Sequence, residues 1–564
     1  MAWVALGVGQ LIAGIGRPQG SPVAAVGSAA IDGAPSAVKN FAISAFGPHD
    51  KTVLVLGILV VLAVLSAAIG IAAMHRLRNG YIGLAIFAVI GLAAALTRPD
   101  AELWDVLPTL IGALAGAYTL SRLVLVAGGR SPRRLAPGES PPALPPRPGR
   151  PRSAPQPDVS PPDFIVPADP ARADQPEPEA AAQSGPSAER PPAPRFRSGP
   201  PSDEPRRPPW QPGRRTFLTA SAVAVAAGGV GALAGRALTE RSNVSTALSH
   251  IRFPRAAHPV PPLPPGTDFG IKGLSSFITP NSDFYRVDTA LILPQVAPQT
   301  WQLRIHGMVE REITLSYHDL LKRPLIEDWI TLCCVSNPVA GPYIGNAKWL
   351  GASLASLLRA ARPRAGADQL LCTSTDGFTS GTPLATVLDG RDALLAVAMN
   401  GAPLPVAHGF PVRMVTPGLY GYVSATKWVT DIKVTTFRGN YAYWAQRGWS
   451  QRGPIKTESR IDVPGGGSVP AGQRQVAGVA WAQHKGIDAV HVRVDRGPWH
   501  QARLAAVPGI DTWRQWAWDW DATRGNHLIE ARATDATGYT QTALQEPPEP
   551  NGASGYPSVT VAVS

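Results

Sequence analysis

The sequence predicts an α+β protein in which transmembrane helices precede a mixed α+β domain and a C-terminal β-sandwich. Three observations support this: long apolar runs within residues 1–128, mixed helix-like and strand-like patterns over 270–460, and short alternating strands over 461–564. With 564 residues, the chain is long enough for roughly three to four domains.

The basic charge of the chain does not indicate nucleic-acid binding. The formal net charge is +12, but many arginines lie in a Pro-rich stretch or beside apolar segments. Positive charge beside apolar segments is typical of the cytoplasmic side of membrane proteins. The sequence has neither zinc-finger spacing nor interleaved aromatic and basic residues, so nucleic acid is excluded as the expected partner.

Three apolar segments, Thr52–Met74, Gly80–Leu96 and Val106–Val126, approach the length of about 20 residues that a membrane helix needs. The loop at 75–78 is basic and the loop at 97–105 is acidic, which predicts a cytoplasmic first loop and an external second loop. Residues 2–15 are either a clipped membrane helix or a signal-like segment, and residues 17–51 are expected to form a loop.

The apolar segments are expected to anchor the chain or to dock a partner. A haem between them would need paired axial histidines, whereas His49 and His75 fall outside the apolar cores.

Residues 129–213 are dominated by Pro, Ala, Arg, Glu and Ser, and this composition predicts a disordered cytoplasmic linker. The pair Arg214-Arg215, with Phe217-Leu218 and a weakly apolar segment to Leu238, resembles a twin-arginine translocation signal. The alternative is an ordinary membrane anchor. Because the twin-arginine route exports folded proteins, often with a cofactor inserted, residues 214–238 predict an extracytoplasmic, cofactor-bearing domain after a Pro-rich stalk at 239–269.

The domain at 270–460 is expected to combine short strands with two short helices. The expected strands are 301–308, 369–374, 410–416 and 428–436, and the expected helices are 315–321, with Ser316 as N-cap, and 353–361. Residues 461–564 contain short alternating strands separated by turns, the pattern of an Ig-like antiparallel sandwich without a Cys pair. The tryptophans of this region, Trp481, Trp499, Trp513, Trp516, Trp518 and Trp520, are expected in the core and interfaces.

The chain has three cysteines, and two of them, Cys333 and Cys334, are adjacent. A cysteine can be a soft ligand for a redox metal, a nucleophile or a small buried apolar residue, and its side chain alone does not decide between these roles.

The segment TLCCVSN (331–337), followed by GNAKWLG, resembles the active-site segment T-L-x-C-x-x-N of the sulfite oxidase family of molybdenum enzymes. The resemblance implies that Cys334 is the catalytic molybdenum ligand and that Cys333 is a packing residue. Cys372 has no expected role. The family's fold is a molybdopterin domain followed by an Ig-like dimerisation domain, which the resemblance places at 270–460 and 461–564.

A second block, His408-Gly-Phe-Pro-Val-Arg413 with Lys427-Trp428, resembles the family's pterin-phosphate segment. It implies that His408, Arg413, Ser424 and Lys427 bind a molybdenum–molybdopterin cofactor. The chemistry is suitable, because a guanidinium forms charge-assisted bonds with a phosphate dianion and the amides of 418–424 can add an anion-binding nest.

A third segment, ITPNSDFYRVDTAL, resembles one that touches the pterin in bacterial relatives. It implies that Asn281, Tyr285 and Arg286 are further cofactor-binding residues. Thr375, beside Asp376, is a weaker candidate of the same kind.

Several positions depart from the sulfite-oxidising members of the family. Pro338, Val339 and the segment 280–282 stand where those enzymes carry arginines, and Trp449 stands where they carry a tyrosine. The loss of arginines removes charge that would hold a sulfite dianion, although Arg447 and Arg452 can replace part of it. A neutral S- or N-oxide is therefore at least as plausible a substrate.

The expected function is oxygen-atom transfer on a small S- or N-containing substrate, either sulfite oxidation or S/N-oxide reduction, by a multi-pass cell-membrane protein with an extracytoplasmic catalytic domain. A separate electron-transfer protein, a cytochrome or a quinone-linked partner, is expected because the sequence carries no haem or Fe–S motif. The C-terminal domain implies a homodimer. The alternative is a non-catalytic envelope protein for binding or assembly that retains the fold, and a cysteine-dependent hydrolase has little support.

Overall fold

The computed structural model describes residues 1–35, 50–98, 101–128, 214–241 and 251–564, together with the isolated positions 38, 41, 45, 46, 244 and 248. Residues 1–128 and 214–564 belong to one compact unit. The predicted linker at 129–213 lies outside the described residues.

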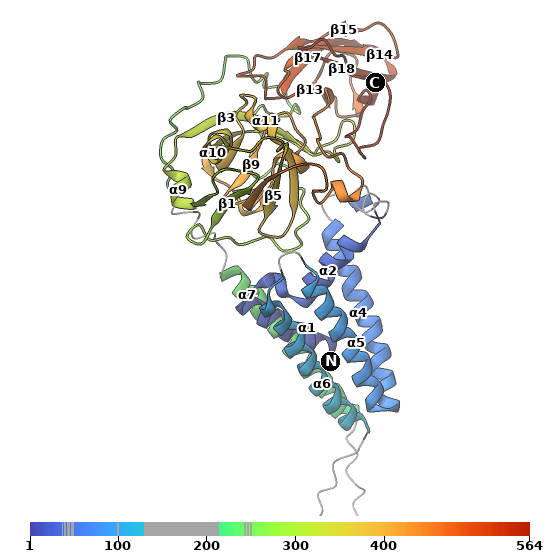
Figure 1. Cartoon of the computed structure of the whole chain (residues 1–564). Helices are drawn as coiled ribbons and strands as arrows, with labels where there is room; N and C mark the ends of the chain where they lie inside the picture. The colour runs from blue at the N-terminus through green and yellow to red at the C-terminus, as the bar shows by residue number, and fades with distance from the viewer. Residues whose placement is uncertain are drawn as a thin grey trace, which may run out of the picture. The chain divides into compact units, whose positions relative to one another are not determined.

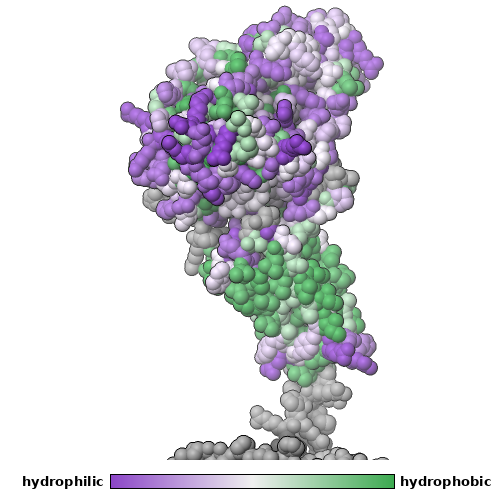
Figure 2. Space-filling view, viewed as in Figure 1, coloured by the Kyte–Doolittle hydropathy of each residue, from purple (hydrophilic) through white to green (hydrophobic). Residues whose placement is uncertain are grey.

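The N-terminal half of this unit is helical and forms one bundle (Figure 1). Its helices are α1 Ala2–Ile15, α2 Pro22–Gly33, α4 Asp50–His75, α5 Leu77–Leu96, α6 Val106–Gly128 and α7 Arg214–Arg241. Within the described residues, α4, α5, α6 and α7 are long and apolar enough to cross a membrane. Figure 2 shows that apolar residues cover the visible surface of the bundle. The three helices expected from the apolar segments are confirmed.

Glycines pack the short helix α1 against α7. A β-carbon on Gly7 would clash with the backbone of Gly228, and one on Gly14 would clash with Gly235. Small residues of this kind let two membrane helices approach closely without a side chain between them. The 14 residues of α1 therefore belong to the bundle through helix packing.

The loop expected over residues 17–51 is wrong in its first half, because α2 forms there with Pro22 in its first turn. Proline is favourable at this position, since the amide it lacks would have no helical partner. A β-carbon on Gly27 of α2 would lie 2.6 Å from Leu291 and 3.5 Å from Ile58 of α4. α2 is thus held between a membrane-type helix and the sheet-rich part of the chain.

The sheet-rich part begins with two mixed α+β layers. One sheet has the strand order β2-β1-β10-β5-β6, with β1 and β10 parallel, and the other has the order β3-β4-β7-β8, with β9 paired to β7. The strands of the first sheet are β1 Gln302–Gly307, β2 Ile313–Ser316, β5 Gln369–Ser374, β6 Thr379–Pro383 and β10 Val429–Thr435. Those of the second are β3 Leu325–Cys333, β4 Ile344–Ser353, β7 Leu394–Met399, β8 Ala402–Pro403 and β9 Arg413–Val415.

Short helices connect these strands: α9 Tyr317–Leu321, α10 Leu354–Ala361, α11 Leu384–Leu388 and α12 Gly421–Ser424. Ser316 caps α9 and forms a reciprocal capping box with Asp319, as its position in the sequence predicts. Ser353 caps α10 in the same way through the amide of Ser356. The predicted helix over 315–321 begins two residues late, because Leu315 and Ser316 complete β2.

The Pro-rich residues 251–269 lie against this domain, so the globular part begins before Gly270. The amides of Ala257 and His258 donate to the carbonyl of Leu325 (2.8 and 3.3 Å), and that of Glu327 donates to the His258 carbonyl at 3.0 Å. The reason is that β3 has an open edge, and an extended chain satisfies its backbone groups.

The C-terminal part consists of two sheets that share one core, a sandwich as expected. Their orders are β11-β13-β17-β16 and β12-β19-β18-β14-β15. The main strands are β11 Glu458–Val463, β13 Gly472–Trp481, β14 Ile487–Val494, β17 Arg514–Ala522, β18 Gly525–Asp535 and β19 Ser558–Val563. Shorter strands are β12 Gly467–Val469, β15 His500–Gln501 and β16 Arg503–Leu504. Trp481, Trp513, Trp516 and Trp520 are buried as expected, while the Ig-like assignment stays a prediction.

Candidate functional site

The two adjacent cysteines lie at the end of β3, where the chain turns toward β4. Backbone hydrogen bonds join the Cys334 amide to the Tyr343 carbonyl (2.9 Å) and the Asn337 amide to the Cys334 carbonyl (3.1 Å). The side-chain oxygen of Asn337 accepts from the Tyr343 amide at 2.8 Å. The asparagine of the TLCCVSN motif therefore closes the turn that holds the Cys334 thiol in place.

The environments of the two thiols differ. Cys333 is fully buried in a cluster with aromatic residues such as Phe277 and Trp329, and burial raises the pKa of its thiol. The Sγ of Cys334 lies 2.9 Å from the Ser336 hydroxyl. Burial also raises the pKa of Cys334, but the Ser336 hydrogen bond and the charge of Lys427 oppose that rise. Groups that favour a thiolate act on both sulfurs, Arg460 and Asn337 on Cys333, and Ser336 and Lys427 on Cys334.

Arg413, on β9, is a buried cation whose hydrogen-bond partners among the described residues include no carboxylate. Its guanidinium donates to the carbonyls of His408 (3.1 Å), Ala425 (3.3 Å) and Met414 (3.4 Å). It also lies 5.1 Å from the ring centre of Trp349. Burial lowers the pKa of Arg413 to about 10. A buried guanidinium held only by carbonyl dipoles favours the binding of an anion.

Asp288 joins three further cations. It accepts from Lys427 (2.7 Å), from Arg286 (2.8 Å) and from Lys51 (2.5 Å), which belongs to α4. Burial alone would raise the pKa of Asp288, but Lys427 and Lys51 hold it well below its ordinary value. Burial lowers the pKa of Lys427 to about 8, although Asp288 opposes the shift. Asp288 thus holds three cationic side chains around one buried carboxylate.

His408 and an aromatic pair connect the cations to the cysteine turn. Burial, followed by the charges of Arg413 and Lys427, lowers the pKa of His408 to about 4, so its imidazole is neutral at pH 7. Phe284 packs edge-on against His408 (5.6 Å between ring centres) and stacks on Tyr285 (5.3 Å). Burial, with the nearby Cys334 and Cys333 thiols, raises the pKa of Tyr285.

The structure thus brings together Cys334, Tyr285, His408, Arg413 and Lys427, five of the nine residues that the sequence identifies as site residues. We call this group the anion cradle.

The remaining candidates have other partners. The hydroxyl of Thr375 donates to the Trp428 carbonyl (3.1 Å), and that of Ser424 donates to the carbonyls of Leu419 and Tyr420. Both side chains are thus engaged with the backbone.

Asn281 and Arg286 lie at the edge of the cradle. Asn281 donates to the Met399 carbonyl at 3.2 Å and accepts from Asn400 at 2.8 Å. The side chain of Arg286 is 39% exposed and pairs with Asp288, and its charge also acts on His408 and Lys427.

The two arginines considered as substitutes for the missing substrate-binding arginines are also engaged. Arg447 lies 3.6 Å from the ring centre of Tyr443 and pairs with Asp32 of α2 at 3.3 Å. Arg452 lies over the ring of Phe437 at 5.5 Å. Their charges are therefore directed to aromatic and helical partners of this chain.

Sequence reasoning missed Asp288, Ser336, Phe284 and Trp349. Ser336 could be found by its position two residues after Cys334. Asp288 had no comparable signal, because its function depends on two distant residues. Lys51 lies 237 positions before it in the sequence, and Lys427 lies 139 positions after it.

The residues of the cradle fit a metal held by a phosphate-bearing organic cofactor. In the part of the chain that the structure describes, no group of three or more His, Cys, Asp or Glu side chains could hold a metal ion. A metal would therefore need ligands from a cofactor in addition to the single soft thiolate of Cys334. Arg413 and Lys427 supply the charge that a phosphate requires, and Gly409 lets them pack closely, because a β-carbon there would lie 3.0 Å from Arg413 and 3.1 Å from Lys427.

Comparison with known proteins agrees with this geometry. The family model for the oxidoreductase molybdopterin binding domain matches residues 290–444. The chain is 32% identical to the sulfite oxidase of Gallus gallus over 296 residues, which cover 44% of this chain and 63% of that protein. It is 31% identical to the mitochondrial sulfite oxidase of Mus musculus over 43% of this chain and 52% of that protein. The chain thus spans between half and two thirds of these relatives.

Two further relatives extend the comparison. The uncharacterized oxidoreductase YuiH of Bacillus subtilis is 31% identical over 153 residues, which cover 27% of this chain and 74% of that protein. The sulfane dehydrogenase SoxCD of Paracoccus pantotrophus aligns with 24% identity and a TM-score of 0.42, over 48% of this chain and 76% of that one. The matched domain, together with the cysteine turn and the cradle, shows that the chain belongs to the sulfite oxidase family of molybdopterin-dependent oxidoreductases, whose cofactor is a molybdenum–pterin.

Proposed function

We propose that this chain is a membrane-anchored, extracytoplasmic oxidoreductase that transfers an oxygen atom to or from a small S- or N-containing substrate. The observation that carries the proposal is the combination of the Cys334 thiol with the buried, carboxylate-free Arg413. A thiol with a purely structural role does not require an anion-binding guanidinium in the same site. A thiol that ligates the metal of a pterin cofactor does, because the guanidinium binds the phosphate of that cofactor.

Each residue of the cradle has a proposed task. Arg413 and Lys427 bind the phosphate end of the cofactor, and neutral His408 packs beside them without adding charge. Ser336 hydrogen-bonds the Cys334 sulfur and favours its thiolate form, which is the form that ligates a metal. Tyr285 and Phe284 exclude water from the site through their stacked rings. When bound, the cofactor supplies the two-electron, oxygen-transferring chemistry.

We propose a neutral S- or N-oxide as the substrate in preference to the sulfite dianion. Pro338 and Val339 follow the cysteine turn in place of arginines. Arg447, the expected replacement, is paired with Asp32 and stacked on Tyr443. Trp449 is buried among aromatic residues in the same cluster as Cys333. These features favour a substrate that does not require a fixed positive charge.

The proposed topology is supported by the ends of the helices that contact the sheet-rich domain. Lys51 in the first turn of α4 pairs with Asp288, and Arg98, just after α5, lies in a pocket with domain residues. These are the helix ends that the positive-inside rule assigns to the outside. The twin-arginine-like start of α7 is consistent with export of the folded domain.

We also propose that electrons are exchanged with a separate carrier and that the C-terminal sandwich mediates a homodimer. Both follow from the family and from the absence of haem or Fe–S motifs in the sequence.

The test is a dye-linked assay of the full chain, purified from an export-competent host fed with molybdate. We expect about one molybdenum per chain and turnover of S- or N-oxides with a reduced dye. Cys334→Ser should abolish this activity, while the control Cys372→Ser, in the remote core strand β5, should retain it. Sulfite oxidation faster than oxide reduction would contradict the substrate proposal, and a metal-free chain with a reactive Cys334 thiol would contradict the enzyme proposal.

A further inference from the structure

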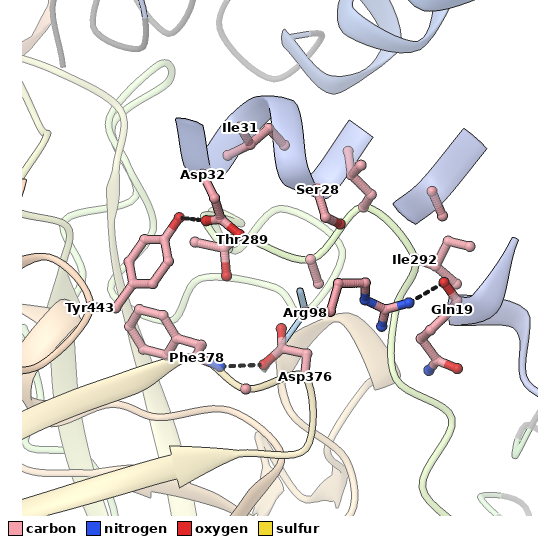
Figure 3. Close-up of a pocket in the computed structure, with 14 residues that line it drawn as sticks. Gln19, Ser28, Ile31, Asp32, Arg98, Thr289, Ile292, Asp376, Phe378 and Tyr443 are labelled. Carbon is pink, nitrogen blue, oxygen red and sulfur yellow. Dashed lines mark hydrogen bonds between the residues drawn. The ribbon is translucent and has the colours of Figure 1, made fainter. Parts of the chain in front are cut away.

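A second pocket lies where the helical bundle meets the sheet-rich domain (Figure 3). It encloses about 620 Å³, counting its open mouth. Residues from α2, from the end of α5 and from three domain loops line it, including Asp32, Arg98, Leu291, Asp376, Phe378 and Tyr443. One wall is thus formed by the apolar bundle and the other by the domain that carries the anion cradle.

This pocket shares a wall with the cradle. Thr289, Ala290, Leu291 and Ile292 line the pocket, and they directly follow Asp288, the counter-ion of Lys427. In another domain loop that lines the pocket, Asp376 follows Thr375, which is hydrogen-bonded to the carbonyl next to Lys427 in the sequence. The charges of Asp288 and Lys427 also act on the carboxyl of Asp376, Asp288 raising its pKa and Lys427 lowering it. The pocket and the proposed cofactor site are therefore neighbours.

The polar groups of the pocket suit a ligand that carries two opposed oxygen atoms. Tyr443 donates its hydroxyl proton to Asp32 at 2.6 Å, which leaves the phenolic oxygen able to accept a hydrogen bond. Asp376 accepts from the Phe378 amide at 3.2 Å, and burial raises the pKa of its carboxyl. The ring of Phe378 lies 5.7 Å from that of Tyr443, and both rings flank the opening (Figure 3).

We propose that this pocket binds the headgroup of a membrane quinone or quinol, the carrier that exchanges electrons with this enzyme. The quinol hydroxyls would donate to the oxygens of Tyr443 and Asp376. The apolar side chains of Ile31, Leu291 and Ile292 provide contacts for the tail. A lipid-dissolved carrier can reach this site because Arg98, which lines it, lies just after α5, a helix long and apolar enough to cross a membrane.

The inference rests on the proposed oxygen-transfer function, and the reaction balances with it. Substrate, water and quinone give oxidised substrate and quinol; two electrons and two protons pass from the substrate–water pair to the quinone. The reverse reaction takes the oxygen of an S- or N-oxide and yields reduced substrate, water and quinone. Tyr443 and Asp376 are placed to exchange the protons of the quinone, while the oxygen transfer occurs at the cradle.

Quinol binding can be tested without turnover. The probe is ubiquinol with a single isoprene unit, whose hydroxyls can donate to both oxygens, titrated by calorimetry into the full chain in nanodiscs, with and without the molybdenum cofactor. We expect saturable one-site binding in both forms. Tyr443→Phe and Asp376→Asn should each weaken binding by about tenfold, the effect of losing one hydrogen bond. The matched control Tyr441→Phe, which alters an exposed neighbouring tyrosine, should leave binding unchanged.

Three outcomes would overturn the proposal. One is the absence of saturable binding to the wild-type chain, and the second is equal binding to Tyr443→Phe, Asp376→Asn and wild type. The third is equal affinity for a dimethoxybenzene analogue with the same tail and no hydroxyls, which would identify the pocket as a site for any lipid-like molecule. Because the chain without cofactor is also measured, these results are independent of the dye-linked activity that tests the proposed function.

Discussion

Replacing Asp288 with asparagine isolates the contribution of the counter-ion that the sequence did not reveal. The change preserves the shape of the side chain and removes its charge, so that Lys427 is left without an anion while its side chain remains only 11% exposed. Breaking a buried ion pair by removing one partner costs about 3–5 kcal/mol. Arg286 and Lys51 are 39% and 25% exposed, and an exposed pair contributes only about 0–1 kcal/mol. The Lys427 pair therefore dominates the expected loss.

This loss predicts a lower melting temperature for the full chain without cofactor. The melting temperature is measured in detergent by tryptophan fluorescence. At about 2 °C or more per kcal/mol, Asp288→Asn should melt at least about 6 °C below wild type. Asp283→Asn changes an exposed carboxylate in the same loop and should stay within about 0.5 kcal/mol of wild type. Bound cofactor should narrow the difference, because its phosphate restores negative charge. If Asp288→Asn melts together with Asp283→Asn, Asp288 is not the counter-ion that stabilises the cradle.

Three further predictions address the site. Cys334→Ser should abolish the dye-linked activity and the bound molybdenum, whereas Cys333→Ser should retain most of both, and equal losses would refute the assignment of the ligand. Arg413→Met should lower the affinity for the pterin cofactor by about 10- to 100-fold, because a hydrogen bond to a charged group contributes about 1.5–3 kcal/mol. The measurement is the pterin content per chain, and the control is Arg438→Met, which changes an exposed arginine. The wild type should lose up to about 3 kcal/mol of stability as the pH falls from 6.5 to 4, because the pKa of His408 is about 4 in the folded chain and the unfolded chain binds more protons over that range. His408→Gln should remove this part of the pH dependence of the melting temperature, and an unchanged acid slope would contradict the buried, neutral imidazole.

Elements governed by local or one-dimensional rules could be predicted from the sequence. The spans α4, α5 and α6 follow from apolar length alone, since a bilayer requires a long uninterrupted run. The N-cap Ser316 was predicted from the preference of a hydroxyl for free helix amides, whereas Ser353, predicted as the first helical residue, is the N-cap in the structure. In contrast, α2 was missed because its short pattern is stabilised by packing against the neighbouring helices and Leu291.

The amino-acid sequence by itself determined the family and predicted the proposed metal ligand Cys334 and the cationic residues of the cradle, because these depend on residue type and short spacing. Only the tertiary structure decided which charges remain available. It paired Lys427 with Asp288 and Lys51, left Arg413 with carbonyl partners, and directed Arg447 away to Asp32. The physical reason is that electrostatic pairing and burial depend on distances through space, and no local pattern encodes a contact between residues that are hundreds of positions apart.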